Sequence, residues 1–234
     1  ETVAGTPVRR PDPAERPPLG APVRDPDLDG RHVVVSAGGT AEAIDPVRYI
    51  GNRSTGRMGV AIAEAALARG ALVTMVAGRV EVPLPAAARV VRAESTAAMR
   101  DAVLDTVLGD PADVLVMAAA VADFRPRHAA AVKLARGGSL TLELEPTEDI
   151  LAEVSARARE LAPPARPVIV GFAAETGSLD RAPEKLRRKG ADLLVANDVA
   201  EPGSGFGTAT NRVSILVADG SREDLPLLTK REVA

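Results

Sequence analysis

Glycines, small residues and hydroxyl groups gather in four stretches near the ends of predicted strands or the start of a predicted helix. These are residues 36–40, 52–59, 117–124 and 171–175. In an open α/β sheet, ligands bind beyond the carboxyl ends of the strands, where small residues let a ligand approach the backbone closely. We therefore expect one binding site assembled from these four stretches.

Each stretch allows a specific chemistry and also has an ordinary structural explanation. Gly38 and Gly39 can approach a phosphate or simply form a turn, and they are not part of a G-x-G-x-x-G dinucleotide pattern. Residues 52–59 offer a helix N-terminus to an anion, or form an ordinary N-cap. Asp123 can hold Mg²⁺ or a hydroxyl group, or cap a loop. Phe172 can be a ring platform for a ligand or part of the core.

Lysine is rare in this chain, since 25 of its 29 Lys and Arg residues are arginine. The four lysines are Lys133, Lys185, Lys189 and Lys230. Their rarity makes them candidates for positions that need a compact ammonium group rather than a planar guanidinium. Lys185 and Lys189 lie four residues apart on a predicted helix, where like charges repel unless an anion lies between them. The alternative is a solvated basic face.

Alternating strands and helices predict the scaffold that positions these groups. The expected strands are residues 32–36, 72–77, 90–92, 114–117, 168–172 and 193–196, and the expected helices are 58–69, 95–108 with Ser95 as N-cap, and 182–189. Short β-branched runs between helices are typical of parallel strands buried on both faces. The pattern predicts an α/β fold with a Rossmann-like, doubly wound, mostly parallel sheet.

Two segments interrupt this alternation and are expected to form β-hairpins. Residues 132–135 and 140–145 flank a glycine-containing turn, and residues 213–218 and 225–228 flank Asp219 and Gly220. A hairpin arm on a parallel sheet often covers a site or joins a partner subunit. We expect residues 121–146 to form such a substrate and dimerisation arm.

The composition excludes several classes of protein. A net charge of −3, a pI near 5.6 and an aromatic content of 2% argue against nucleic-acid binding. The absence of cysteine excludes disulfides, cysteine-ligated metals and a cysteine nucleophile within this chain, and two histidines are too few for an all-histidine metal site. Without a membrane span of about 18 apolar residues or a signal-peptide core, a cytoplasmic protein that does not bind membranes is expected.

Residues 1–30 differ from the rest of the chain. They hold seven of the 19 prolines, mixed with Arg, Asp and Glu, and they lack apolar periodicity. This composition is typical of a disordered leader or an interdomain linker. We expect one folded domain over residues 31–234, joined by that linker to a further part of a longer protein.

Six motifs follow one another along the chain, at residues 37–40, 45–50, 52–59, 119–125, 171–176 and 196–198. Together they resemble the phosphopantothenoylcysteine synthetase family, the phosphopantothenate–cysteine ligases of coenzyme A biosynthesis. The resemblance covers about residues 31–230. In bacteria this family usually forms the C-terminal half of a bifunctional protein. The resemblance therefore implies a fused or associated flavin-dependent decarboxylase as partner.

The resemblance implies that the chain joins (R)-4′-phosphopantothenate to L-cysteine in two steps. In the bacterial type, CTP converts the carboxylate to an acyl-cytidylate and releases pyrophosphate, after which the cysteine amine displaces CMP. Lys133 is implied in forming the acyl-cytidylate, by neutralising charge on the α-phosphate. Asn52 is implied in the second step, where its amide can donate to the developing oxyanion. Mg²⁺ is implied as cofactor, with Asp123 as a ligand, because two anionic substrates must meet.

The resemblance also implies the residues of both substrate sites. The nucleotide site is Gly39, Ser54, Gly56, Gly59, Met117, Ala118, Ala119, Asp123, Lys133, Glu148, Asp149, Ile150, Leu151, Phe172, Lys185, Lys189 and Asn197. The phosphopantothenate site is Asn52, Ala119, Ala120 and Asp123, with Arg48 supplied by the partner subunit. A homodimer is therefore implied.

Other functions stay open from the residues alone. A Rossmann-type reductase would use NADP, with Arg79 at the 2′-phosphate, although no acidic residue ends the strand at 72–77 to bind the ribose of NAD. A nucleotide-sensing module would bind CTP without releasing pyrophosphate. ATP is the alternative nucleotide, because the sequence does not reveal contacts to the base edge.

Overall fold

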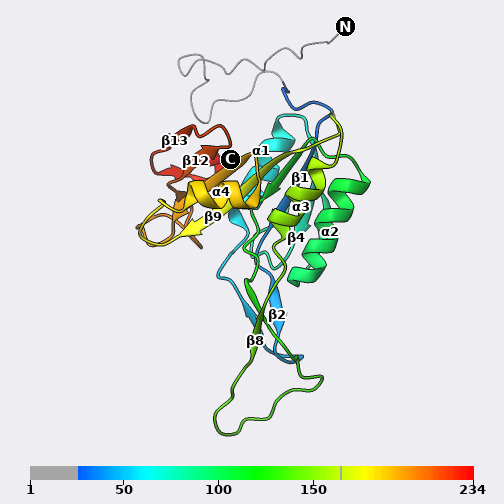
Figure 1. Ribbon diagram of the computed structural model, residues 1–234, viewed down its shortest axis with the longest axis vertical. Helices are drawn as coiled ribbons and strands as arrows, with labels where there is room; N and C mark the ends of the chain where they lie inside the picture. Colours follow the sequence, from blue (N-terminus) through cyan, green and yellow to red (C-terminus); the bar gives the residue numbers. More distant parts are fainter. Residues whose placement is uncertain (1–25, 164) are drawn as a thin grey trace.

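The computed structural model describes residues 26–163 and 165–234. Its centre is an eight-stranded sheet with the order β13-β12-β10-β9-β6-β1-β4-β5 (Figure 1). The strands are β1 His32–Ala37, β4 Leu72–Ala77, β5 Arg89–Arg92, β6 Val114–Met117, β9 Val168–Glu175, β10 Leu193–Asp198, β12 Ser214–Val217 and β13 Arg222–Asp224. The pairs from β5 through β10 are parallel, and only β12 and β13 join antiparallel. This is the Rossmann strand order, so the predicted fold class is confirmed.

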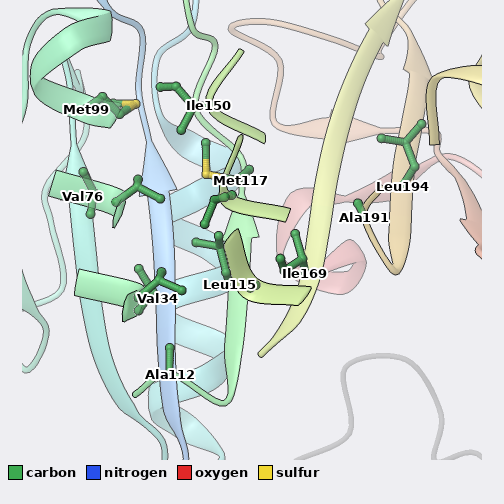
Figure 2. Close-up of a cluster of buried hydrophobic side chains, with 14 of the residues drawn as sticks. Val34, Val76, Met99, Ala112, Leu115, Met117, Ile150, Ile169, Ala191 and Leu194 are labelled. Atoms are coloured by element: carbon green, nitrogen blue, oxygen red, sulfur yellow. The ribbon is translucent and has the colours of Figure 1, made fainter. Parts of the chain in front are cut away.

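Helices cover both faces of the sheet. They are α1 Arg57–Ala68, α2 Thr96–Gly109, α3 Ile150–Arg159, α4 Ala182–Lys189 and α5 Lys230–Val233. Successive residues of β1 point to opposite faces. Val33 and Val35 belong to the cluster with Val60 of α1, whereas Val34 belongs to the cluster with Met99 of α2. Figure 2 shows this second cluster, which also holds buried residues of α3 and α4. The helix predicted to start at Ser95 is confirmed, since the Ser95 side chain accepts a hydrogen bond from the Ala98 N–H.

An arm projects from the carboxyl edge of the sheet (Figure 1). It pairs β2 Ala41–Ala43 with β3 Tyr49–Gly51, and β7 Phe124–Pro126 with β8 Leu144–Pro146. The predicted strands at residues 132–135 and 140–145 are wrong in their bounds, because strand pairing is confined to the root of the arm. There Arg125 forms ion pairs with Glu145 and Glu148. The intervening residues 127–143 are mostly exposed and bury no apolar face that would support longer strands.

The second predicted hairpin exists with a shorter turn. Its return strand is β13, at Arg222–Asp224 rather than residues 225–228, because the turn is tight: the Val217 N–H donates to the Ser221 carbonyl, and Gly220 has φ of 89°. Leu228 instead belongs to β14 Leu228–Thr229, which pairs with β11 Thr210–Asn211.

The predicted leader at residues 1–30 lies mostly outside the described residues. Residues 26–30 form a turn beside the end of α1, where the Leu28 N–H donates to the Arg69 carbonyl and the Arg69 guanidinium pairs with Asp27 at 2.6 Å. No helix within the described part of the chain is long and apolar enough to span a bilayer.

Candidate functional site

A cavity of about 720 Å³ opens at the carboxyl edge of the sheet, beside the point between β1 and β6 where the strand order reverses. This is the place where doubly wound sheets bind their ligands. The predicted site residues that line it are Asn52, Ser54, Gly56, Gly59, Met117, Ala118, Ala119, Ala120, Asp123, Glu148, Asp149, Ile150, Leu151, Phe172, Lys185, Lys189 and Asn197. Of the predicted set, Gly39, Lys133 and Arg48 lie elsewhere. Three of the four stretches found in the sequence thus meet at this cavity, whereas residues 36–40 reach only a smaller neighbouring one, through Gly39 and Thr40.

The N-terminus of α1 lines the cavity and has no side-chain cap. Gly56 is the N-cap residue, with φ of 79°, and no side chain caps the helix. A Cβ at Gly59 would lie 2.6 Å from the Ala37 Cβ, so the first turn of α1 packs directly against the end of β1. The N–H groups of an uncapped first turn and the positive end of the helix dipole suit an anion.

Gly39 lines a second, smaller cavity of about 260 Å³ that shares Asn52 and Ser54 with the main one. The Gly39 N–H donates to the Arg79 carbonyl, which ties this loop to the end of β4. The Arg79 guanidinium lies 4.6 Å from the centre of the Tyr49 ring and lines the smaller cavity, not the main one. This placement does not favour Arg79 as the 2′-phosphate ligand of an NADP site in the main cavity.

Asn52 uses both hydrogens of its side-chain amide within the protein. Its Nδ2 lies 3.0 Å from the Ala120 carbonyl oxygen and 2.9 Å from the Val121 carbonyl oxygen. Only the NH₂ group can satisfy two carbonyl acceptors, so the orientation of the amide is fixed. The amide therefore has no hydrogen free for the predicted oxyanion contact in this conformation. Its Oδ1 atom is the group left for a ligand.

The two lysines of α4 each have a carboxylate partner. Lys185 Nζ lies 3.1 Å from Glu175, and Lys189 Nζ lies 2.5 Å from Asp149. The protein itself therefore supplies a counter-charge to each lysine, so their spacing does not by itself require a bound anion. Both lysines still line the cavity, and a stronger anion can compete for them.

Asp123 is an exposed carboxylate at the edge of the cavity. Among residues 26–163 and 165–234, no group of three or more Asp, Glu, His or Cys side chains is arranged to hold a metal ion. Mg²⁺ is often held by one or two carboxylates together with substrate phosphates. Asp123 fits that mode of binding, and does not form a metal site by itself. Neighbouring Glu148 is engaged with Arg125, and a backbone hydrogen bond together with that guanidinium holds the pKa of Glu148 below its ordinary value.

Arg48 and Lys133 lie on the arm, away from the cavity of their own chain. The buried Asp45 carboxylate accepts hydrogen bonds from the Arg48 guanidinium and from the Leu134 N–H, and Arg48 also donates to the Leu134 carbonyl at 3.0 Å. The hydrogen bonds of Arg48 are the main cause that lowers the pKa of Asp45 well below its usual range. This clamp joins the two halves of the arm and leaves Lys133 exposed beside it.

Several residues that line the cavity were not predicted individually as site residues from the sequence. They include Arg57, Arg188, Phe206, Asn211 and Lys230. Lys230 belonged to the set of four rare lysines, which was the one available signal for it. Phe206 lies between Gly205 and Gly207, whose φ values of 101° and 75° are readily adopted only by glycine and shape a loop that no apolar pattern reveals.

The comparisons with known proteins agree with this geometry. The family model described as "DNA/pantothenate metabolism flavoprotein C-terminal domain" matches residues 28–234. The coenzyme A biosynthesis bifunctional protein CoaBC of Bacillus subtilis is 44% identical over 210 residues, which cover 88% of this chain and 50% of the relative. The Mycobacterium tuberculosis protein of the same name is 49% identical over 208 residues, covering 85% and 49%.

A crystal structure of the C-terminal domain of CoaBC has a TM-score of 0.71 and 37% identity to this chain, and the match covers 88% of this chain and 91% of that one. The chain spans about half the length of the curated relatives. The family resemblance predicted from the motifs is thereby confirmed. This chain belongs to the family of DNA/pantothenate metabolism flavoprotein C-terminal domains.

Proposed function

We propose that this chain is the phosphopantothenate–cysteine ligase part of a coenzyme A biosynthesis protein. It joins 4′-phosphopantothenate to L-cysteine with CTP and releases CMP and pyrophosphate. The observation that carries the proposal is the main cavity at the sheet edge, which gathers most residues of the nucleotide and phosphopantothenate motifs. The names of the relatives support the pathway, and their bifunctional character supports a decarboxylase partner fused to this part.

The first step needs the nucleotide phosphates to be held beside the carboxylate of phosphopantothenate. The uncapped start of α1, with Ser54, Gly56 and Gly59, is suited to the phosphates. Phe172 and Phe206 both line the cavity and offer aromatic faces to the base. The carboxylate oxygen attacks the α-phosphorus, and the bond from that phosphorus to the pyrophosphate oxygen breaks. Positioning and charge neutralisation supply most of the catalysis in such a transfer.

Mg²⁺ fits this site as an ion carried by the nucleotide phosphates with Asp123 as its protein ligand, and when bound it would neutralise phosphate charge. The chain's own cations that line the cavity include Lys185, Arg188 and Lys189 as well as Arg57 and Lys230, together with the positive end of the α1 helix dipole. Lys133 is proposed to reach the α-phosphate from the exposed loop of the arm. That role requires the arm to approach a cavity, either its own or that of a second subunit.

In the second step the cysteine amine attacks the acyl carbon, the bond to the CMP oxygen breaks, and the amine loses a proton. Because the Asn52 NH₂ group is held by the Ala120 and Val121 carbonyls, we assign its free Oδ1 as an acceptor for the attacking amine. This replaces the oxyanion contact expected from the sequence. Asn52 thus orients the nucleophile, and its two hydrogen bonds fix the position of Oδ1.

A homodimer is proposed to complete the site. The arm carries apolar side chains that are largely exposed, with Val132 73% and Leu140 56% accessible. A second copy of the chain is the partner that would bury them and bring Arg48 of one arm to the phosphopantothenate of the other subunit. The clamp between Arg48, Asp45 and Leu134 supports this, because it presents Arg48 on a fixed part of the arm.

The proposal is tested by following the carboxylate oxygens of phosphopantothenate into the products. Phosphopantothenate with ¹⁸O in its carboxylate is incubated with CTP, Mg²⁺ and cysteine, and the products are analysed by mass spectrometry. An acyl-cytidylate intermediate transfers one ¹⁸O to CMP and yields the cysteine amide. Amide formation without label in CMP would contradict the acyl-cytidylate. Binding of CTP with neither product would favour the nucleotide-sensing alternative, and tight NADPH binding would favour the reductase.

A further inference from the structure

Lys230 is buried at the wall of the main cavity. Its relative exposure is 8%, and its Nζ donates a hydrogen bond to the Gly205 carbonyl at 2.8 Å. Within the described residues, no carboxylate lies within 4 Å of this ammonium, whereas the other two cavity lysines each pair with one. Buried lysines are almost always paired, because an isolated charge loses its hydration. The structure therefore holds a desolvated cation that lacks a counter-ion.

A second cation stands next to Lys230 at the start of α1. Arg57 is the first residue of that helix and lines the same cavity, and α5, which begins at Lys230, packs against α1. Burial is the main cause that lowers the pKa of Lys230, and repulsion by Arg57 lowers it further. In the part of the chain that the structure describes, Arg57 forms no ion pair with a carboxylate. Two cations and an uncapped helix N-terminus thus line the same cavity, and among the described residues neither cation has a carboxylate partner.

This arrangement suits an anion with more than one phosphate. An ammonium has three N–H donors, and the Gly205 carbonyl uses one of them, so two remain for phosphate oxygens. The dipole end of α1 supplies a further positive charge. A polyphosphate carries several charges along its length and can contact Lys230, Arg57 and the helix start together.

We propose that Lys230 binds the β- and γ-phosphates of the nucleotide, and so holds the pyrophosphate leaving group of the first step. The inference rests on the proposed ligase function and extends it to a residue outside the predicted motifs. As the bond to the α-phosphorus breaks, negative charge grows on the departing pyrophosphate, and the Lys230 ammonium with Arg57 stabilises it. The phosphate of phosphopantothenate is the competing ligand for this position, and the test separates the two.

The test measures binding by isothermal titration calorimetry, with CTP, CMP and inorganic tripolyphosphate as probes in the presence of Mg²⁺. The variant is Lys230→Met, which keeps the length of the side chain and removes its charge. Removal of one charge-assisted contact should weaken CTP and tripolyphosphate at least tenfold and leave CMP within twofold. The matched control is Arg231→Met, which removes a charge from the next, exposed residue of α5 and should change none of the three.

Arg57→Met provides a second variant at an exposed position, in case Lys230→Met disturbs packing. It should show the same selective loss for CTP and tripolyphosphate. Equal loss of CMP and CTP, or no loss in either variant, would overturn the inference. Both variants are also titrated with 4′-phosphopantothenate, and loss of its binding with CTP unchanged would overturn the inference and assign the site to the acyl substrate. If the unmodified chain binds neither a nucleotide nor tripolyphosphate, the proposed function and this inference both fail.

Discussion

Replacement of Asn52 by Asp tests the second chemical step. The substitution exchanges the NH₂ group for an oxygen and so removes the hydrogen bonds to the Ala120 and Val121 carbonyls, at 3.0 and 2.9 Å. Each such bond contributes about 1 kcal/mol, so the side chain loses roughly 2 kcal/mol of the energy that positions it. Since each 1.36 kcal/mol is a factor of ten, the rate of amine attack should fall about 30-fold. The new carboxylate also faces two carbonyl oxygens, and electrostatic repulsion displaces it from the position of the Asn52 side chain.

The assay is a rapid-quench experiment that follows pyrophosphate and acyl-cytidylate in one time course. Asn52→Asp should give a normal burst of pyrophosphate and then accumulate acyl-cytidylate in the presence of cysteine. Arg53→Met is the control, because Arg53 is exposed and does not line the cavity. Unchanged turnover, or an equal loss of the pyrophosphate burst, would refute the role of Asn52 in orienting the amine.

Three further predictions concern the arm and the start of α1. Lys133→Gln should abolish the pyrophosphate burst and give no acyl-cytidylate in the same assay, since Lys133 is proposed to act before the intermediate forms. Gly59→Ala should lower the free energy of unfolding in urea by about 1–3 kcal/mol, because its Cβ would lie 2.6 Å from the Ala37 Cβ. Because the pKa of Asp45 is lowered in the folded protein, its carboxylate stabilises the arm fully at pH values above its ordinary pKa of 3.8. This stabilisation is lost only as the pH falls through the lower folded-state pKa. The protection factor of the Leu134 amide, its exchange rate relative to an unfolded chain at the same pH, should therefore stay high above pH 4 and fall only in stronger acid. In Asp45→Asn it should be low at every pH, and a Leu134 amide equally protected in both proteins would contradict the clamp.

Most strands of the sheet could be predicted from the sequence because they are short apolar runs that are buried on both faces. Val33, Val34 and Val35 pack alternately on the two core clusters, as such a run requires. The loops that line the cavity were also predictable, since Gly56 and Gly59 must leave room at the start of α1. Both features leave a local pattern in the sequence, an apolar run for the strand and closely spaced glycines for the helix start.

The features that sequence reasoning missed depend on partners far along the chain. The pairing of β7 with β8 is supported by Arg125 with Glu145, twenty residues apart, and not by an apolar pattern. The engagement of the Asn52 amide depends on carbonyls of the loop after β6. The burial of Lys230 follows from the packing of α5 on α1 and from the Gly205 loop. The spacing of residues within a short stretch of sequence does not predict such long-range contacts.

The measurement that tests the ligase proposal most directly is pyrophosphate release in the presence of phosphopantothenate, cysteine and Mg²⁺, with CTP and ATP in parallel. We expect release with CTP that requires phosphopantothenate and is accompanied by one molecule of amide product per pyrophosphate. Release with ATP alone would keep the ligase and overturn the choice of CTP. No release with either nucleotide, from a chain that forms a dimer, would contradict the proposed ligase function.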